Sequence, residues 1–324
     1  MYMDAFATSE YGLNTTRRRW LGAVLGLWSS GALGMSKPLK NKRSLVGYAL
    51  DTVTIEWRAA QLRQMQDAFR LYPEIDFIYT DSQGETANQV ADIEDLIARG
   101  VDVLLASPRD SRALAPVIGR AHRAGIPVVL VTRRVVGEAF TTFVAPDDEA
   151  IGRDVARYIA DALRGKGRVL VLQGVPSTTT AIARSQSFEQ ELKRWPDIRI
   201  AASKVANYLR GEAVMAVEET IQQGVAFDAI YAQSDGMASG ARLALTKAGI
   251  DPRSKVIVGI DYSREAREAI QAGSQSASFV YPTCATEVLG VVRTVLAGRR
   301  VPRRVTVASQ RITRANVNQI PPTY

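Results

Sequence analysis

Within residues 89–134, apolar residues occur in two patterns that take turns along the chain, helical spacing and short apolar runs. The first part carries apolar residues at helical spacing (Val90, Ile93, Leu96, Ile97). The two short apolar runs, 101–106 and 127–131, are typical of strands buried on both faces of a sheet. A second helix is expected between these runs, with Asp110 and Ser111 as its capping residues. The pattern therefore predicts helix, strand, helix and strand, with parallel strands joined by right-handed crossovers.

The same alternation continues on both sides of this segment. Further strands are expected at 44–50, 75–79, 141–145, 168–173, 198–205, 228–233, 255–260 and 276–281. Further helices are expected at 55–71, 149–163, 181–194, 211–223, 235–248 and 283–297, with one more ending at 272. The basic tail 299–314 is expected to add a last strand. This order predicts an α/β fold built from two consecutive series of buried strands.

Composition agrees with a globular protein of two ordinary domains. The chain has 324 residues, of which 46% are hydrophobic and 23% charged. Its formal net charge is +8, yet the basic residues are scattered and form no lysine–arginine block or aromatic–basic recognition motif. Nucleic acid is therefore not expected as a partner.

Residues 1–34 have the pattern of a twin-arginine export signal. Arg17, Arg18 and Arg19 precede a short apolar run at 21–28, and small residues follow up to Gly34. The alternative is an amphipathic helix or a retained anchor, although the apolar run is short for a bilayer. We expect the signal to be cleaved, residues 35–43 to form a linker, and the mature chain to reside in the periplasm.

Few residues are suited to catalysis or metal binding. Cys284 is the only cysteine and His122 the only histidine, so a disulfide, a zinc site and a Ser-His-Asp triad are all disfavoured. No glycine-rich dinucleotide motif, phosphate loop or nucleophile elbow is present. We therefore predict no enzyme activity, no catalytic residues, no metal and no cofactor.

Several short segments occur in an order and spacing that resemble a known family. They are QVADIEDLIARG from Gln89, SPxDS from Ser107, AGIPVV from Ala124, LQG from Leu172, AQSDGMA from Ala232, VIVGID from Val256 and YPT from Tyr281. Over residues 44–320 the chain resembles the periplasmic sugar-binding proteins of the ribose- and galactose-binding type, which serve ABC importers. The resemblance implies two Rossmann-like lobes with parallel sheets, joined by three hinge crossings, that close on a ligand by hinge motion. The N-terminal lobe would be 44–146 plus 282–308, and the C-terminal lobe 147–281 plus 309–324.

The same resemblance assigns the cleft positions. They are Asp51, Thr54, Trp57, Ser107, Thr132 and Arg133 in the first lobe, Asp148 and Tyr281 at hinge crossings, and Arg184, Tyr208, Ser234, Asp235 and Asp261 in the second lobe. The family's longer amide and carboxylate side chains are replaced here by Ser107, Thr132 and Ser234. Because these hydroxyls reach less far, a pentose, a hexose, a polyol and a modified sugar all remain open as ligands.

For some of these residues, the alternative to ligand contact is a purely structural role. Arg133 is expected to contact ligand, but an ion pair with Asp147 or Asp110 is the alternative. Arg184 lies in the first turn of a helix, where acids are preferred, and this unfavourable placement indicates a function. Asp261 is alternatively a solvated loop acid, and Trp57 a packing residue at the sheet edge.

We therefore predict a monomer that binds a sugar or sugar-like small molecule and delivers it to an ABC permease. The main alternative is a ligand sensor of the same fold that presents the bound molecule to a membrane receptor such as a sensor kinase. An enzyme on this fold is the least favoured reading.

Overall fold

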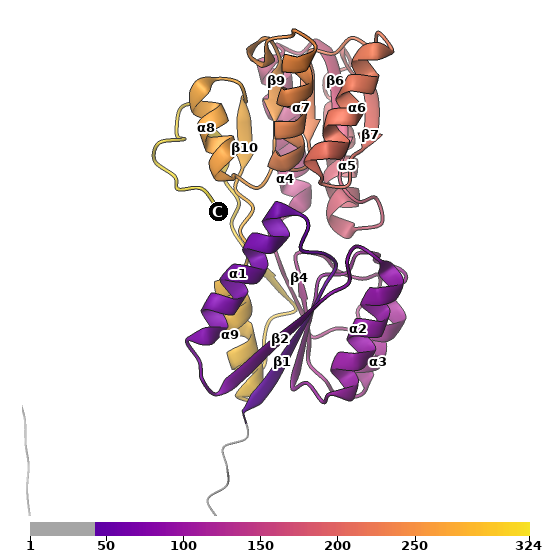
Figure 1. The fold of residues 1–324 in the computed structure, drawn as a ribbon, viewed down its shortest axis with the longest axis vertical. Helices are drawn as coiled ribbons and strands as arrows, with labels where there is room; N and C mark the ends of the chain where they lie inside the picture. Colours follow the sequence, from indigo (N-terminus) through magenta and orange to yellow (C-terminus); the bar gives the residue numbers. More distant parts are fainter. Residues whose placement is uncertain (1–42) are drawn as a thin grey trace, which may run out of the picture. The chain divides into compact units, whose positions relative to one another are not determined.

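The structure is a computed structural model that describes residues 43–324 (Figure 1). The predicted export signal and almost all of the predicted linker lie outside these residues. Within the described residues, the strands form two sheets of six strands each. This confirms the predicted α/β fold with two lobes.

The first lobe is built on a wholly parallel sheet of order β11-β5-β4-β3-β1-β2. Its strands are β1 (Ser44–Leu50), β2 (Ile75–Asp81), β3 (Val103–Ala106), β4 (Val128–Val131), β5 (Thr142–Ala145) and β11 (Arg304–Thr306). Its helices are α1 (Glu56–Arg70), α2 (Thr86–Ala98), α3 (Ala115–Arg123) and α9 (Ala285–Leu296). Helices α1 and α9 pack side by side on one face of the sheet, and α2 and α3 cover the other face (Figure 1).

The second lobe has the sheet order β12-β10-β9-β8-β6-β7. Its strands are β6 (Gly167–Gln173), β7 (Ile198–Val205), β8 (Ala229–Ala232), β9 (Val256–Val258), β10 (Ala277–Phe279) and β12 (Arg311–Thr313). Its helices are α4 (Asp148–Ala162), α5 (Thr179–Leu192), α6 (Arg210–Gln222), α7 (Asp235–Lys247) and α8 (Arg264–Ala272), with the short 3-10 helix η1 (Pro252–Ser254). The chain passes between the two sheets after β5, after β10 and after β11. The lobe boundaries given above remain predictions.

Three details of the sequence prediction were wrong. The tail forms two strands rather than one, because β11 joins the first sheet and β12 the second. The second sheet is not wholly parallel, since β12 runs antiparallel to β10. Asp110 and Ser111 do not cap α3, which begins at Ala115. The Asp110 carboxylate instead accepts from the backbone N–H groups of two nearby residues, each at 2.8 Å, and closes a turn before the helix.

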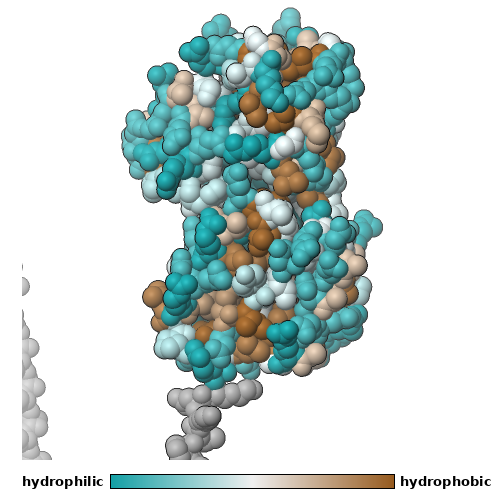
Figure 2. Space-filling model, viewed as in Figure 1, coloured by the Kyte–Doolittle hydropathy of each residue, from teal (hydrophilic) through white to brown (hydrophobic). Residues whose placement is uncertain are grey.

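The surface is mainly polar on the face shown in Figure 2, with apolar residues in small groups. Large exposed apolar side chains such as Leu71, Met215 and Val136 come from separate elements. Single exposed apolar residues of this kind are ordinary in globular proteins. Among the described helices, none is long and apolar enough to cross a bilayer.

Candidate ligand-binding site

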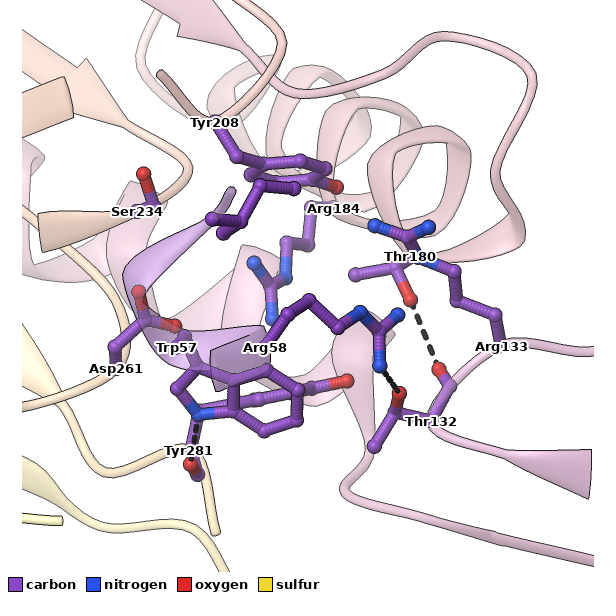
Figure 3. A pocket seen from close by; sticks show the side chains of 11 residues that line it. Trp57, Arg58, Thr132, Arg133, Thr180, Arg184, Tyr208, Ser234, Asp261 and Tyr281 are labelled. Carbon is purple, nitrogen blue, oxygen red and sulfur yellow. Dashed lines mark hydrogen bonds between the residues drawn. The ribbon is translucent and has the colours of Figure 1, made fainter. Parts of the chain in front are cut away.

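A cavity lies where loops of the two lobes meet, and about 350 Å³ of empty space belongs to it when the part open to solvent is included (Figure 3). It is lined by Ile55, Trp57, Arg58, Thr132, Arg133, Thr180, Arg184, Tyr208, Ser234, Asp261 and Tyr281. Most of these residues follow the carboxyl ends of strands or lie at the starts of helices, which is where α/β sheets bind ligands.

Aromatic rings form two sides of the cavity. Trp57 and Tyr281 are in tilted contact, with ring centres 5.3 Å apart, and the indole N–H of Trp57 donates to the Tyr281 carbonyl at 2.8 Å. The Tyr208 ring lies on the other side of the cavity (Figure 3). It packs so tightly on Gly174 that a Cβ there would lie 1.9 Å from the Tyr208 ring. Aromatic faces of this kind pack against apolar edges of a ligand.

The first lobe contributes two buried guanidinium groups that share one carboxylate. Arg133 Nη1 donates to Asp51 Oδ2 at 2.5 Å, and Arg58 Nε lies 3.1 Å from Asp51 Oδ1. Burial alone would raise the pKa of Asp51, but the charges of Arg133 and Arg58 outweigh it and hold that pKa below its usual value. Arg58 also donates from Nη1 to Gln61 at 2.7 Å and to Thr132 at 3.1 Å. Its position is therefore fixed by several partners.

The second lobe holds its own arginine in a similar way. Arg184 Nε donates to Asp148 Oδ1 at 2.8 Å, and its Nη1 donates to the Gln233 carbonyl at 2.7 Å. The Tyr281 hydroxyl donates to the other carboxylate oxygen of Asp148 at 3.2 Å, and the guanidinium lies 4.4 Å from the Tyr281 ring centre. Burial raises the pKa of Asp148, although the adjacent Arg184 charge opposes this. Arg184 is only 2% exposed, so its remaining N–H groups face the cavity or the protein.

Asp261 differs from the other acids of the site. It follows β9, is 6% exposed and lines the cavity, yet no side chain within residues 43–324 donates a hydrogen bond to its carboxyl group. Burial raises the pKa of Asp261 well above its usual value, and the nearby Asp235 carboxylate adds to the shift. This carboxyl group is therefore available to a bound molecule.

Three residues that line the cavity have positive backbone φ angles. They are Thr132 at 58°, Tyr208 at 66° and Asp261 at 122°. Residues other than glycine rarely adopt such angles, and strain of this kind concentrates at functional sites. The loops that carry these side chains must therefore be held by other contacts.

The structure brings most of the predicted site residues to the cavity, but not all of them. Asp51 and Asp148 lie behind it as partners of the arginines. Ser107 also lies behind it and donates its hydroxyl to the Val131 carbonyl at 2.7 Å. Thr54 lines an adjoining cavity. Asp235 is 2% exposed and points to a neighbouring turn instead. The ligand-binding roles of all thirteen remain predictions.

Sequence reasoning overlooked Arg58 and Thr180, which both line the cavity. Arg58 is a basic residue in the first turn of α1, which is the signal that we used for Arg184. For Arg184 that placement was wrong, because α5 begins at Thr179 and Arg184 lies in its second turn. The alternative partners named for Arg133, Asp147 and Asp110, are not those it uses, since it pairs with Asp51. In the part of the chain that is described, no three His, Cys, Asp or Glu side chains gather as a metal site would require.

Comparisons with known proteins agree with this geometry. Residues 46–286 match the periplasmic binding protein domain family. The chain is 31% identical to the xylitol-binding protein of Mycolicibacterium smegmatis over 256 residues, covering 78% of this chain and 71% of the relative. It is 29% identical to the ribose import binding protein RbsB of Bacillus subtilis over 233 residues, covering 70% and 74%.

A solved structure gives the same picture of the fold. The fructose-binding periplasmic domain of a hybrid two-component system superposes with a TM-score of 0.81 and 27% identity, over 85% of this chain and 92% of that one. The family match covers most of the chain and both lobes, so the resemblance stated from the sequence motifs is confirmed. The chain belongs to the periplasmic binding protein family, in the type 1 branch of the ribose- and galactose-binding type.

Proposed function

We propose that the chain captures an uncharged sugar or polyol in the cavity between its lobes and delivers it to an ABC importer. The observation that carries this proposal is the lining of one small cavity by aromatic rings, three guanidinium groups and one available carboxyl group. Aromatic faces suit the C–H faces of a sugar, while guanidinium and carboxyl groups suit its hydroxyls. The xylitol-binding and ribose import relatives support the same ligand class.

The charge balance of the site favours a ligand without charge. Arg58 and Arg133 are matched by Asp51, and Arg184 is matched by Asp148. Asp261 supplies the third carboxyl group. Its pKa is raised in the folded protein, but hydrogen bonds donated by sugar hydroxyls would favour its ionised form, which brings three acids against three arginines. A charged ligand would disturb this balance in a buried site, where unmatched charge is costly.

Two of the short hydroxyls that line the cavity are already used by the protein. Thr132 accepts from Arg58 at 3.1 Å and donates to the Val131 carbonyl at 2.8 Å. Ser234 caps α7 by accepting from the Met237 N–H at 3.2 Å. The ligand would therefore be held mainly by the arginines and Asp261. These three arginines retain N–H donors beyond the bonds described here, since a guanidinium has five.

The proposal is tested by thermal-shift screening and calorimetry with pentoses, hexoses and polyols, including D-ribose, xylitol and D-fructose. A compound that binds only the folded state raises the melting temperature. Arg184→Ala should weaken the tightest of these compounds by at least about tenfold, because it removes charged donors from a buried site. Arg157→Ala is the matched control, since Arg157 pairs with Glu191 on the exposed side of α4 and should leave affinity unchanged. Affinity within about twofold of the parent for Arg184→Ala would contradict the site assignment.

A sensory role is the second candidate. It is favoured by the similarity to the periplasmic domain of a hybrid two-component system. The two roles differ in partner, so genes for a permease and an ATPase beside this gene would favour import, and genes for a kinase and a regulator would favour sensing. Ligand-dependent stimulation of the reconstituted permease's ATPase activity would test import directly.

The chain would be exported by its twin-arginine signal, work as a monomer and release the bound sugar unchanged. Replacing Arg17 and Arg18 by lysine should leave the precursor in the cytoplasm in a cell-fractionation assay. Light scattering of the purified protein should give a monomer mass, and NMR of the bound sugar should show no turnover.

A further inference from the structure

The turn that carries Asp261 has two successive residues in unfavourable backbone conformations. Asp261 has φ of 122° and Tyr262 has φ of 59°. Neither is glycine, so the turn persists only if surrounding contacts hold it. Its geometry decides whether the Asp261 carboxyl group faces the cavity.

Asp235 holds this turn from inside the second lobe. Its Oδ2 accepts from the backbone N–H of Tyr262 at 2.7 Å and of Ser263 at 3.2 Å, and from the Ser278 hydroxyl at 2.7 Å. Its Oδ1 accepts from Gln275 Nε2 at 2.8 Å. Four donors therefore converge on one carboxylate, which only an ionised acid can satisfy fully.

Two other features support this arrangement. A Cβ at residue 259 would lie 1.9 Å from Asp235 Oδ1, so Gly259 leaves the space that the carboxylate occupies. On the other side of the turn, the Thr323 hydroxyl donates to the Asp261 carbonyl at 2.7 Å, and the Thr323 N–H donates to the Tyr262 carbonyl at 2.8 Å. Asp235 thus holds the N–H groups of Tyr262 and Ser263, and Thr323 holds the carbonyls of Asp261 and Tyr262.

We infer that Asp235 is a positioning residue that acts on the ligand through Asp261: its carboxylate fixes the 261–263 turn that presents the Asp261 carboxyl group to the cavity. This role differs from the direct ligand contact predicted from the sequence, because Asp235 does not line the cavity. The inference rests on the proposed function, since it concerns the affinity of the same site for a sugar or polyol.

A double-mutant cycle tests the inference, with D-ribose and xylitol as separate calorimetric probes. Asp235→Asn keeps the size of the side chain but turns an NH₂ group toward one of the four donors. We expect it to weaken binding about tenfold, as loss of a charged hydrogen bond does. In the Asp261→Ala background, the same change should alter affinity by less than about twofold, because the group through which it acts is absent.

Asp228→Asn is the matched control. Asp228 also accepts from a backbone N–H, that of Arg168 at 2.9 Å, but it lies at the opposite end of the sheet from the cavity. Its replacement should leave affinity unchanged. If Asp235→Asn does not fold, Ser278→Ala keeps the carboxylate but removes one of its donors and a second acceptor of the Tyr262 N–H (3.1 Å), and a several-fold weakening is expected.

Hydrogen exchange supplies a readout that needs no ligand. The Tyr262 and Ser263 amides should exchange faster in Asp235→Asn than in the parent and in Asp228→Asn. Unchanged exchange, or effects of Asp235→Asn that are equal with and without Asp261, would overturn the inference. Failure of the unaltered protein to bind any sugar or polyol would instead contradict the proposed function.

Discussion

The Asp51 carboxylate accepts a 2.5 Å hydrogen bond from Arg133, and both side chains are buried. The same carboxylate lies 3.1 Å from Arg58 Nε. One carboxylate therefore pairs with two guanidinium groups that line the cavity. Since an unmatched buried charge is costly, Asp51 should matter for the stability of the first lobe as well as for the shape of the site.

Asp51→Ala should destabilise the protein by about 3–5 kcal/mol, because it leaves two buried guanidinium groups without their carboxylate. Urea denaturation, followed by circular dichroism, measures the change. Asp67→Ala is the control, since Asp67 pairs with Arg70 on an exposed helix surface and should change stability by less than about 1 kcal/mol. Equal midpoints for the two variants would contradict the role of Asp51.

Stability at acid pH should depend on Asp51 in a defined direction. The pKa of Asp51 is lowered in the folded protein because the charges of Arg133 and Arg58 outweigh burial. A group whose pKa is lowered in the folded state contributes its full stabilisation at pH values above its unfolded-state pKa, which is about 3.9 for aspartate. That stabilisation is lost as the pH falls from there toward the folded-state pKa. The melting temperature of Asp51→Asn should therefore fall less steeply than that of the parent between about pH 4 and pH 3. Parallel curves would show that Asp51 does not titrate in this way.

Local patterns were enough to predict the fold but not the contacts of the site. The strands β1 and β7 have the predicted bounds, because a continuous or alternating apolar run is a property of neighbouring residues. The partner of Arg133 could not be predicted, since Asp51 comes from a loop 82 residues earlier in the chain. The role of Asp235 likewise depends on Gln275 and Ser278, which are 40 and 43 residues away. Contacts of this range follow from the placement of whole strands.

Gly174→Ala should weaken sugar binding about tenfold or more by displacing the Tyr208 ring. The added Cβ would lie 1.9 Å from that ring, and overpacking forces side chains away from their positions. Calorimetry with the tightest-binding pentose or polyol measures the effect. Gly211→Ala is the matched control, because nothing lies within 4 Å of a Cβ there and binding should not change. Unaltered affinity for Gly174→Ala would mean that Tyr208 does not contact the ligand.

Ligand binding should change the tryptophan fluorescence of the protein through Trp57. Trp57 is 5% exposed and lines the cavity, whereas Trp195 follows α5 and does not line it. Trp57→Phe should abolish the fluorescence change on addition of a binding sugar, and Trp195→Phe should preserve it. A change that persists in Trp57→Phe would place the ligand elsewhere.

Ser177 connects the loop before α5 to the loop after β3 across the two lobes. Its hydroxyl donates to the Arg109 carbonyl at 2.8 Å, and its carbonyl accepts from the Ser111 N–H at 3.1 Å. Ser177→Ala removes the first of these bonds. If they hold the lobes together around a ligand, the dissociation rate of a bound sugar should rise about threefold, as expected for one hydrogen bond. Stopped-flow measurement of the Trp57 signal gives this rate.

Ser254→Ala is the matched control, because Ser254 also donates to a carbonyl, that of Asp251 at 2.7 Å, but lies before β9, away from the cavity. Equal dissociation rates for the two variants would show that the Ser177 contact does not retain the ligand.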